Sequence, residues 1–484
     1  MISRVGRAGV AVLAAALVPA TVVAVAAAQP SGRSERPVAT SASRPATPAG
    51  AHDATRPWLT KQVADRMASA RVGGLRPRGA VSPIRTRTAV STAVSTPRRE
   101  VFGFAGAGSL GDPDVGYTTW NFSLLTTVAF FGLSVNASDG SLVQNDTGWS
   151  VWHSSTASDF INAAHAHGVR VLLTLIFQDF QGQNSPMCQA LDNGQTTIDQ
   201  AANQLLGADG IDLDYEGVNQ TCPGGVTLRT KLDQFVQMVR ARGLGTLVID
   251  TYAGSAEDGG GFFDIPTLAG SVDALFVMAY GLEAPNGPCA TCMGPTSPLE
   301  GSAPNSIWNV TRAANDYAPW AAKTIMGFPY YGVAGCVQGP NPPANAPVLS
   351  NYTADPYTTL AALSSIPSVS SLTVSRDALD PNGQEPWATF FNSDPQFQCW
   401  REAYWDDPVS LGHKYDLVNN DGFKGAGIFT LDFGGGSPEL WATLDAKFGV
   451  SATGITPAGG SAMGGDSVQI AGSLFRQGAT VAFG

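Results

Sequence analysis

Three carboxylates at alternate positions in the stretch GADGIDLDYEG, residues 207–217, constrain this chain more than any other feature. Asp212, Asp214 and Glu216 are separated by apolar or aromatic residues. A period of two is the period of a β-strand, so the three acids are expected on one face of a strand. Charges are costly to bury, and crowded carboxylates disfavour one another's ionisation. The pattern therefore predicts at least one acid that keeps its proton near neutral pH and can donate it.

Two other interpretations compete with a catalytic one. An EF-hand calcium loop starting at Asp209 would need glycine at its sixth position and glutamate at its twelfth, where Asp214 and Gln220 stand, so that interpretation is disfavoured. A solvated edge strand would instead bury Ile211 and Leu213 and expose the acids, and spacing alone leaves this alternative open. Asp209 itself lies off the acidic face and is expected to form turn or backbone hydrogen bonds.

The run DGIDLDYE, residues 209–216, resembles position for position the signature of glycoside hydrolase family 18, the chitinases and related endo-β-N-acetylglucosaminidases. Three further stretches are similar to motifs of that family: Met278-Ala279-Tyr280, Gly327-Phe328-Pro329-Tyr330-Tyr331-Gly332, and Tyr404-Trp405-Asp406-Asp407 with Ser410 and Leu411. The resemblance covers about residues 101–449. It implies a TIM barrel with catalytic groups at the carboxyl ends of its strands.

The resemblance also implies a role for each acid. Glu216 would protonate the glycosidic oxygen and later activate water. Asp214 would orient the substrate's own acetamide, whose carbonyl oxygen attacks the anomeric carbon. Asp212 would share a proton or hydrogen bond with Asp214, and the Tyr280 hydroxyl would donate to the acetamide oxygen. No metal or cofactor is implied, and the side chains implied to bind substrate are Met278, Tyr330, Tyr331, Trp405 and Phe429.

The chain departs from the family pattern at three places. Thr174 keeps the hydroxyl at the end of the third strand, but Ile176 and Phe177 stand where the family has two glycines. Gly281 follows Tyr280, where the family commonly has aspartate. Phe429 stands where a tryptophan usually stacks on the sugar, so stacking is retained with a smaller ring that has no N–H.

Short apolar runs from Val101 onward predict repeated βα units and a parallel sheet. Roughly seventy residues between the seventh and eighth strands are too many for a simple loop, so an inserted subdomain is expected at about 333–403. A final helix is expected over 437–448. The eight strands that would close a TIM barrel are expected at 101–105, 127–131, 169–175, 210–215, 246–252, 274–279, 324–328 and 427–431.

The two ends of the chain differ in composition from the barrel. Residues 1–28 contain Arg4 and Arg7, an apolar run and a small-residue cleavage pattern, which predict a secretory signal peptide, with an uncleaved membrane anchor as the alternative. Residues 29–99 are rich in Ser, Pro and Arg and predict a disordered basic linker. Residues 456–484 resemble the incomplete start of an IPT/TIG-like immunoglobulin module.

Charge and function class are linked. The net charge is −11, yet 15 of the 28 basic residues and only three of the 39 acids precede Glu100. The barrel is therefore strongly acidic, which argues against nucleic acid and polyanions as partners. The resulting prediction is a secreted, monomeric glycosidase acting on chitin, with no membrane association after signal cleavage. Two alternatives remain open: the same chemistry on peptidoglycan or N-glycans, and a sugar-binding protein without catalysis.

Six cysteines in an exported chain predict disulfides, for which fifteen connectivities are possible. Their order along the barrel favours Cys188–Cys222, Cys289–Cys292 and Cys336–Cys399, because each pair would join one loop or two neighbouring loops. The Cys289–Cys292 spacing also fits a redox motif or half a zinc site, but no second such pair or histidine cluster accompanies it.

Overall fold

The computed structural model describes residues 75–85, 99–257, 259, 261–282, 292–301, 308–449, 451–459 and 467–473. The predicted signal peptide, most of the predicted linker and Cys289 lie outside these residues. None of the described helices combines the length and apolar character needed to cross a membrane.

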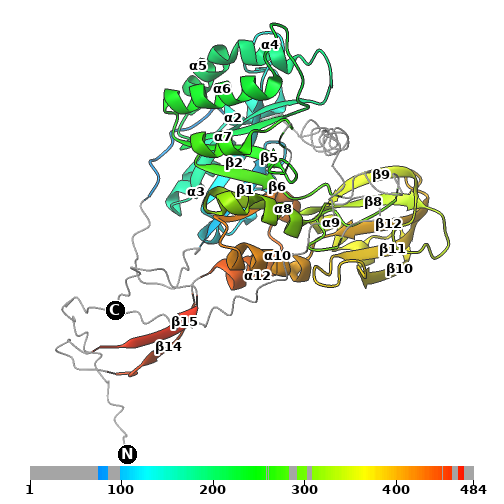
Figure 1. The fold of residues 1–484 in the computed structure, drawn as a ribbon. Coiled ribbons are helices and arrows are strands. Elements are labelled where there is room, and N and C mark those ends of the chain that lie inside the picture. The colour runs from blue at the N-terminus through cyan, green and yellow to red at the C-terminus, as the bar shows by residue number, and fades with distance from the viewer. Residues whose placement is uncertain are drawn as a thin grey trace, which may run out of the picture.

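Eight parallel strands close into a barrel, which confirms the predicted fold class for this part of the chain (Figure 1). The eighth strand ends at Phe429, two residues before its predicted end, because Leu431 begins a short helix. In spatial order the strands are β1 (Glu100–Gly106), β13 (Gly425–Phe429), β7 (Thr324–Pro329), β6 (Ala274–Met278), β5 (Thr246–Tyr252), β4 (Gly210–Gly217), β3 (Arg170–Asp179) and β2 (Thr127–Ser134).

Helices cover the outside of the barrel (Figure 1). The longest of the described helices, α6, begins after Thr227, whose side chain accepts from the Thr230 N–H, and ends at Gly243 with φ 71°. The helices are α2 (Thr147–Trp152), α3 (Ser155–Ala166), α4 (Met187–Asp192), α5 (Gly194–Gln204), α6 (Leu228–Arg242), α7 (Ile265–Ser271), α8 (Val310–Tyr317), α9 (Tyr357–Leu360), α10 (Pro408–Asn420), α11 (Leu431–Gly434) and α12 (Pro438–Phe448).

Aromatic rings fill the barrel interior. Phe276 on β6 contacts the rings of Phe102 and Phe104 on β1, with centroid distances of 5.4 and 5.0 Å. Two glycines on neighbouring strands leave room for this ring: a Cβ on Gly327 would lie 2.5 Å from Phe276, and one on Gly427 only 2.1 Å from it. The glycines are therefore needed for close packing rather than for a special backbone conformation.

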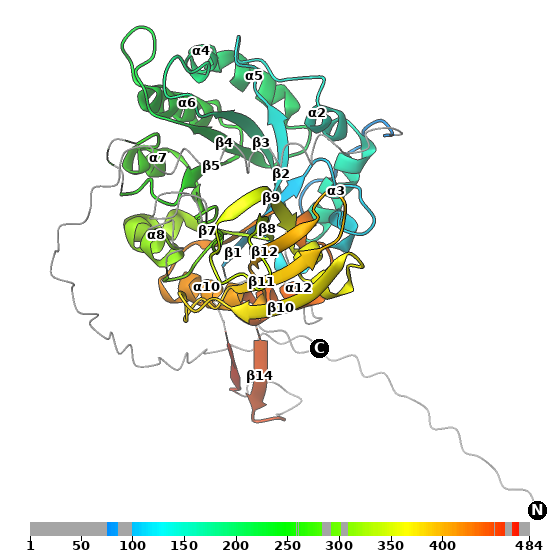
Figure 2. The ribbon, with the colours of Figure 1, turned by 90° about the vertical axis from the view of Figure 1, so that its right-hand side faces the viewer.

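The residues predicted as an insertion form a separate antiparallel sheet between β7 and α10. Its strands, in the order β10-β11-β12-β8-β9, are β10 (Val369–Arg376), β11 (Pro386–Asn392), β12 (Cys399–Trp405), β8 (Tyr331–Val337) and β9 (Val348–Pro356). The predicted disulfide Cys336–Cys399 joins β8 to β12. Since β8 continues directly from β7, this sheet stands at the carboxyl end of the barrel strands; in Figure 2 it lies in front of them.

Buried charges anchor the inserted sheet to the barrel. Asp406, which follows β12, is paired with Lys414 of α10 and accepts from the Ser410 hydroxyl at 2.6 Å. Glu385, which precedes β11, lies 3.4 Å from the same ammonium group. Asp407 caps the first turn of α10. Both aspartates of the YWDD segment, Asp406 and Asp407, therefore have structural contacts with α10.

Part of the predicted linker is packed on the barrel. Residues 75–85 run along α2 and α3: the Arg78 guanidinium stacks over Trp152 at 4.7 Å, and the Ser82 N–H donates to the Asn162 side chain at 2.8 Å. The prediction of a disordered linker therefore does not describe residues 75–85, because they have stacking and hydrogen-bond partners on α2 and α3.

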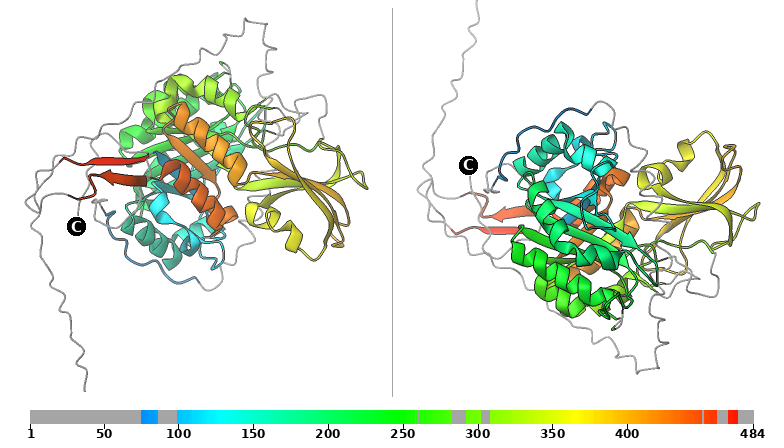
Figure 3. Two further views of the ribbon diagram at one scale, coloured as in Figure 1. Left: turned by 90° about the horizontal axis from the view of Figure 1, so that it is seen from below. Right: turned by 90° about the horizontal axis from the view of Figure 1, so that it is seen from above.

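At the other end of the chain, β14 (Ser451–Thr456) and β15 (Gln469–Ser473) form a two-stranded antiparallel hairpin. It lies on the opposite side of the barrel from the inserted sheet (Figure 3). The hairpin begins five residues before the predicted module boundary at 456. Two described strands do not establish an immunoglobulin-like fold, so that module stays a prediction.

Candidate active site

The three alternating acids lie on β4 and are buried, with 0% of Asp212, 2% of Asp214 and 3% of Glu216 exposed. Ile211, Leu213 and Tyr215 between them are also buried, because the barrel covers one face of the strand and helices cover the other. Tyr215 stacks between Phe177 and Phe235 of α6, which places it on the outer face. The solvated-edge-strand interpretation is therefore wrong: β4 is a central barrel strand.

Asp212 is held as a neutral acid by its surroundings. Complete burial raises the pKa of its carboxyl from 3.8 to about 7, and a hydrogen bond from the Thr174 hydroxyl, 2.9 Å from Oδ2, opposes part of that rise. Thr174 stands directly opposite Asp212 in the β3–β4 register. The family serine position is thus filled by a residue that makes an equivalent donor.

Aromatic side chains from several barrel strands contact one another. The Tyr280 and Phe429 rings are stacked at 5.4 Å with 22° between their planes. Tyr331 meets Tyr280 edge-on at 6.1 Å, and Phe104 and Phe131 pack edge-on against Phe429 at 5.5 and 5.7 Å. Three of the nine predicted site residues, Tyr280, Tyr331 and Phe429, therefore form one aromatic group. They lie at or just after the ends of β6, β7 and β13.

Three predicted substrate contacts lie in other surroundings. The Tyr330 hydroxyl is 3.3 Å from that of Tyr415 on α10, and its ring packs beside Gly434, so it belongs to the outer packing layer. The prediction for Tyr330 is therefore not supported: it points to the side opposite from its neighbour Tyr331. Met278 ends β6 opposite Gly327, and Trp405 ends β12, both almost completely buried.

Gln178 is a site residue that sequence reasoning missed. It stands directly opposite Glu216 in the β3–β4 register. Its amide nitrogen donates to Asp214 Oδ2 at 2.8 Å and to Glu216 Oε1 at 2.9 Å. A single side chain from the third strand thus links the two acids that the family resemblance makes catalytic.

Asp250 on β5 was also missed, and it adds a fourth buried carboxyl to this region. Val248 stands opposite Asp212, and Leu213 stands opposite Ile249. Because side chains alternate along a strand, Asp250 faces the same side as Val248 and lies level with Asp214. A lone aspartate in the run TLVIDTY has no pattern that would single it out without the barrel register.

The departures from the family pattern now have local explanations. Gly281 adopts φ 68°, a left-handed conformation in which aspartate would be strained. Ile176 stands opposite Asp214 across the β3–β4 ladder, and Phe177 turns outward onto Tyr215. Asp209 lies outside the acidic row as expected: its Oδ2 accepts from the Val171 N–H at 2.8 Å and contacts His165 at 2.9 Å.

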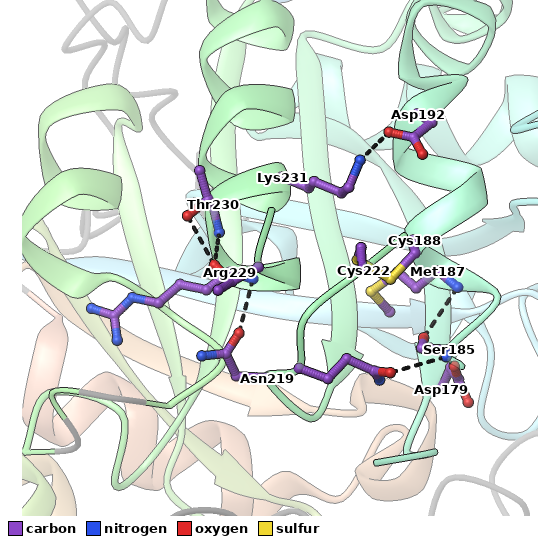
Figure 4. The surroundings of a disulfide bond; sticks show 12 residues. Asp179, Ser185, Met187, Cys188, Asp192, Asn219, Cys222, Arg229, Thr230 and Lys231 are labelled. Atoms are coloured by element: carbon purple, nitrogen blue, oxygen red, sulfur yellow. Dashed lines mark hydrogen bonds and ion pairs between the residues drawn. A yellow bond between two sulfur atoms is a disulfide. The ribbon is translucent and has the colours of Figure 1, made fainter. Parts of the chain in front are cut away.

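A disulfide fixes the loops next to Glu216 (Figure 4). Cys188 on α4 follows β3 and is joined to Cys222, which follows β4. The Ser185 hydroxyl bonds to Asp179, the last residue of β3, and the Arg229 N–H donates to the Asn219 side chain at 3.2 Å. Cys292 is also in a disulfide, and its predicted partner Cys289 lies outside the described residues.

The buried side chains of the candidate site are proton donors and acceptors. Across the part of the chain that the structure describes, no three His, Cys, Asp or Glu side chains are arranged to hold a metal ion. The buried acids and the tyrosine hydroxyls can donate or accept protons, and the Gln178 amide donates hydrogen bonds to two of the acids. Such a set can protonate a leaving oxygen and orient an amide-bearing substrate.

Solved structures with a similar fold include chitinases. Among solved structures, the chain is similar to catalytic domain 2 of the Group II chitinase of Ostrinia furnacalis (TM-score 0.57, 19% identity, 72% of this chain and 96% of that chain). It is also similar to an immunomodulatory chitinase of Trichuris suis (0.55, 16%, 69% and 92%). A third is the C-terminal domain of a putative chitinase from Desulfitobacterium hafniense (0.53, 20%, 72% and 99%).

At these identities the structural likeness shows the fold alone. No curated protein matches the chain. The family model of the glycosyl hydrolases family 18 matches residues 113–434, which include every barrel strand except β1 and all four buried acids. That match covers about two thirds of the sequence, and the chain belongs to glycosyl hydrolases family 18.

Proposed function

We propose that this chain is a secreted retaining glycosidase that hydrolyses β-1,4 bonds after N-acetylglucosamine, with chitin as its substrate. The observation that carries the proposal is the row of buried acids on β4, and the stacked Tyr280 and Phe429 rings support it. Family members without catalysis typically lack the glutamate, whereas Glu216 is present and buried next to Asp214. The acidic barrel also suits an uncharged polysaccharide better than a polyanion.

In the proposed reaction Glu216 donates a proton to the glycosidic oxygen as the bond to the anomeric carbon breaks. The carbonyl oxygen of the substrate's own acetamide forms the new bond to that carbon, so no protein carboxylate becomes the nucleophile. Asp214 accepts from the acetamide N–H, and the Tyr280 hydroxyl donates to its oxygen. Glu216, now ionised, then removes a proton from the water that opens the cyclic intermediate.

Asp212 supports this cycle as a neutral neighbour. Its raised pKa keeps a proton beside Asp214, so Asp214 can carry the negative charge that orients the acetamide. A chitinase structure from Ostrinia furnacalis contains a bound N-acetylglucosamine oligomer, and another contains allosamidin. By extension, we expect chitin oligomers to bind this chain along the aromatic group. We also expect the protein to be a monomer.

The test compares the wild-type chain with Glu216→Gln and with Glu300→Gln, a control at an exposed glutamate. With N-acetylated chitin tetramer to hexamer as substrates, Glu216→Gln should lose about 10³-fold in kcat because it removes the proton donor. Its affinity for the hexamer and its melting temperature should be unchanged, and Glu300→Gln should match the wild type.

The same assay separates the alternatives. Hydrolysis of peptidoglycan or high-mannose glycan in preference to chitin oligomers would move the substrate assignment within the family. Oligomer binding without any hydrolysis by the wild type would identify a lectin instead. Turnover by Glu216→Gln near the wild-type rate would reject the assignment of Glu216 as the acid.

A further inference from the structure

The contact between Gln178 and the two central acids is more specific than a packing contact. Gln178 and Glu216 are paired in the β3–β4 register, and Asp214 lies one pleat back on the same face. One amide nitrogen therefore spans two carboxylates, with donor–acceptor distances of 2.8 Å to Asp214 Oδ2 and 2.9 Å to Glu216 Oε1. Both distances are typical of hydrogen bonds to charged acceptors.

An amide NH₂ group carries two protons and no charge. Two neighbouring carboxyls ordinarily relieve their repulsion by sharing one proton, which leaves the pair with a single negative charge. A donor placed between them can bond to one oxygen of each without giving up a proton. Such bonds favour the ionised form of both acceptors.

We infer that Gln178 is a positioning residue that holds Asp214 turned toward Glu216 and sets the proton occupancy of the pair. The inference rests on the proposed function only for its kinetic consequences. The role of Gln178 does not follow from the family resemblance. In this chain Ile176 and Phe177 replace the two third-strand glycines of the family pattern, and Gln178 is the next residue.

Other ionisable groups surround the pair and act on it in both the wild type and its variants. Asp212 lies behind Asp214 on β4, and Asp250 lies level with Asp214 on β5. Tyr252 on β5 donates to the Gly217 carbonyl at 3.2 Å, and Tyr280 and Tyr331 lie in the aromatic group. Asp212 and Asp250 are carboxylic acids and the three tyrosines are phenols, whereas the Gln178 amide donates hydrogen bonds and does not titrate.

The consequence is a defined pH range. A donor to Glu216 lowers the pKa at which this acid gives up its proton, so the alkaline limb of activity lies at lower pH than it would without Gln178. Removing the amide should move that limb to higher pH. Replacing the amide with a third carboxyl of the same shape should move it further, because like charges oppose ionisation.

The experiment compares wild type, Gln178→Met and Gln178→Glu, with Gln195→Met as control. Gln195 is an exposed glutamine on α5 whose amide donates to Asp199 at 3.1 Å, far along the sequence from the acids. The first measurement is the pH profile of kcat/KM on N-acetylated chitin hexamer. The second is ¹³C-carboxyl NMR titration of Asp214 and Glu216, with signals assigned through Asp214→Asn and Glu216→Gln; it needs no turnover.

The midpoint pH of the alkaline limb and that of the Glu216 titration should both be lowest in the wild type. Both should be about one pH unit higher in Gln178→Met, and higher still in Gln178→Glu. Gln178→Met should also lose about tenfold in kcat with little change in KM, since Asp214 is no longer held. Gln195→Met should match the wild type in every measurement.

Two results would overturn the inference. One is a Gln178→Met variant whose titrations equal those of the wild type; the other is a Gln178→Glu limb at or below the wild-type pH. If the wild type hydrolyses none of the chitin substrates, the proposed function fails, but the NMR titration still supports or rejects the role of Gln178.

Discussion

The neutral state of Asp212 makes the protein's stability depend on pH in a calculable way. Burial raises the pKa of this carboxyl from 3.8 to about 7 in the folded chain. The folded state therefore binds the proton more tightly than the unfolded state does. The resulting stability is fully present below about pH 4 and is lost as the pH rises through 7.

At 1.36 kcal/mol per pKa unit, the raised pKa costs the folded chain more at pH 8 than at pH 5, by about 2 to 3 kcal/mol. Asp212→Asn keeps the shape of the neutral acid and cannot ionise. Thr174 can still donate to its oxygen, as it does to Asp212 Oδ2 now. The variant should therefore avoid a loss of about 2 to 3 kcal/mol between pH 5 and pH 8.

Melting temperatures between pH 5 and pH 8 measure this difference. With an unfolding entropy of about 2 cal/mol/K per residue over roughly 350 folded residues, a loss of about 2 to 3 kcal/mol corresponds to about 3 to 4 °C. Asp212→Asn should lose that much less melting temperature than the wild type over this range. Asp114→Asn, at an exposed aspartate, is the control. Parallel curves for Asp212→Asn and the wild type would refute the assignment of a buried neutral acid.

Two further predictions follow from the packing. Gly427→Ala places a Cβ 2.1 Å from the Phe276 ring, so it should destabilise the barrel by about 1–3 kcal/mol in urea unfolding. Adding Phe276→Leu to this variant should recover part of the loss. An unchanged urea midpoint for Gly427→Ala would show that the barrel interior has room for the extra methyl group. Lys414→Met leaves Asp406 and Glu385 buried without their cation and should cost about 3–5 kcal/mol, with a larger loss at pH 8 than at pH 5 because both acids then have to ionise; equal losses at the two pH values would contradict the buried-charge account.

The acidic row could be predicted from sequence because its information is local. A period of two fixes which residues of β4 share a face, and the eight apolar runs fix the strands within a few residues. The prediction for Tyr330 came from the family motif, which matched two adjacent tyrosines, and not from this rule. Adjacent side chains leave a strand on opposite faces, so at most one of the pair could join the aromatic group. The structure places Tyr331 there, beside Tyr280.

Gln178 and Asp250 could not be predicted because their meaning lies in the strand register. A glutamine at the end of an apolar strand is common, and only its pairing with Glu216 across β3 and β4 makes it part of the site. Asp250 likewise becomes a neighbour of Asp214 only through the β4–β5 register. Composition predicts a linker over residues 75–85, and their contacts with α2 and α3 arise only from the folded surface.

The most direct test of the account is proton NMR of the first products that the wild-type chain releases from N-acetylated chitin oligomers. Attack by the substrate's acetamide, followed by attack of water, inverts the anomeric carbon twice. The account therefore predicts that the new reducing-end N-acetylglucosamine appears first as the β-anomer and equilibrates only later. A product that appears first as the α-anomer, or no product from a folded chain, would contradict it.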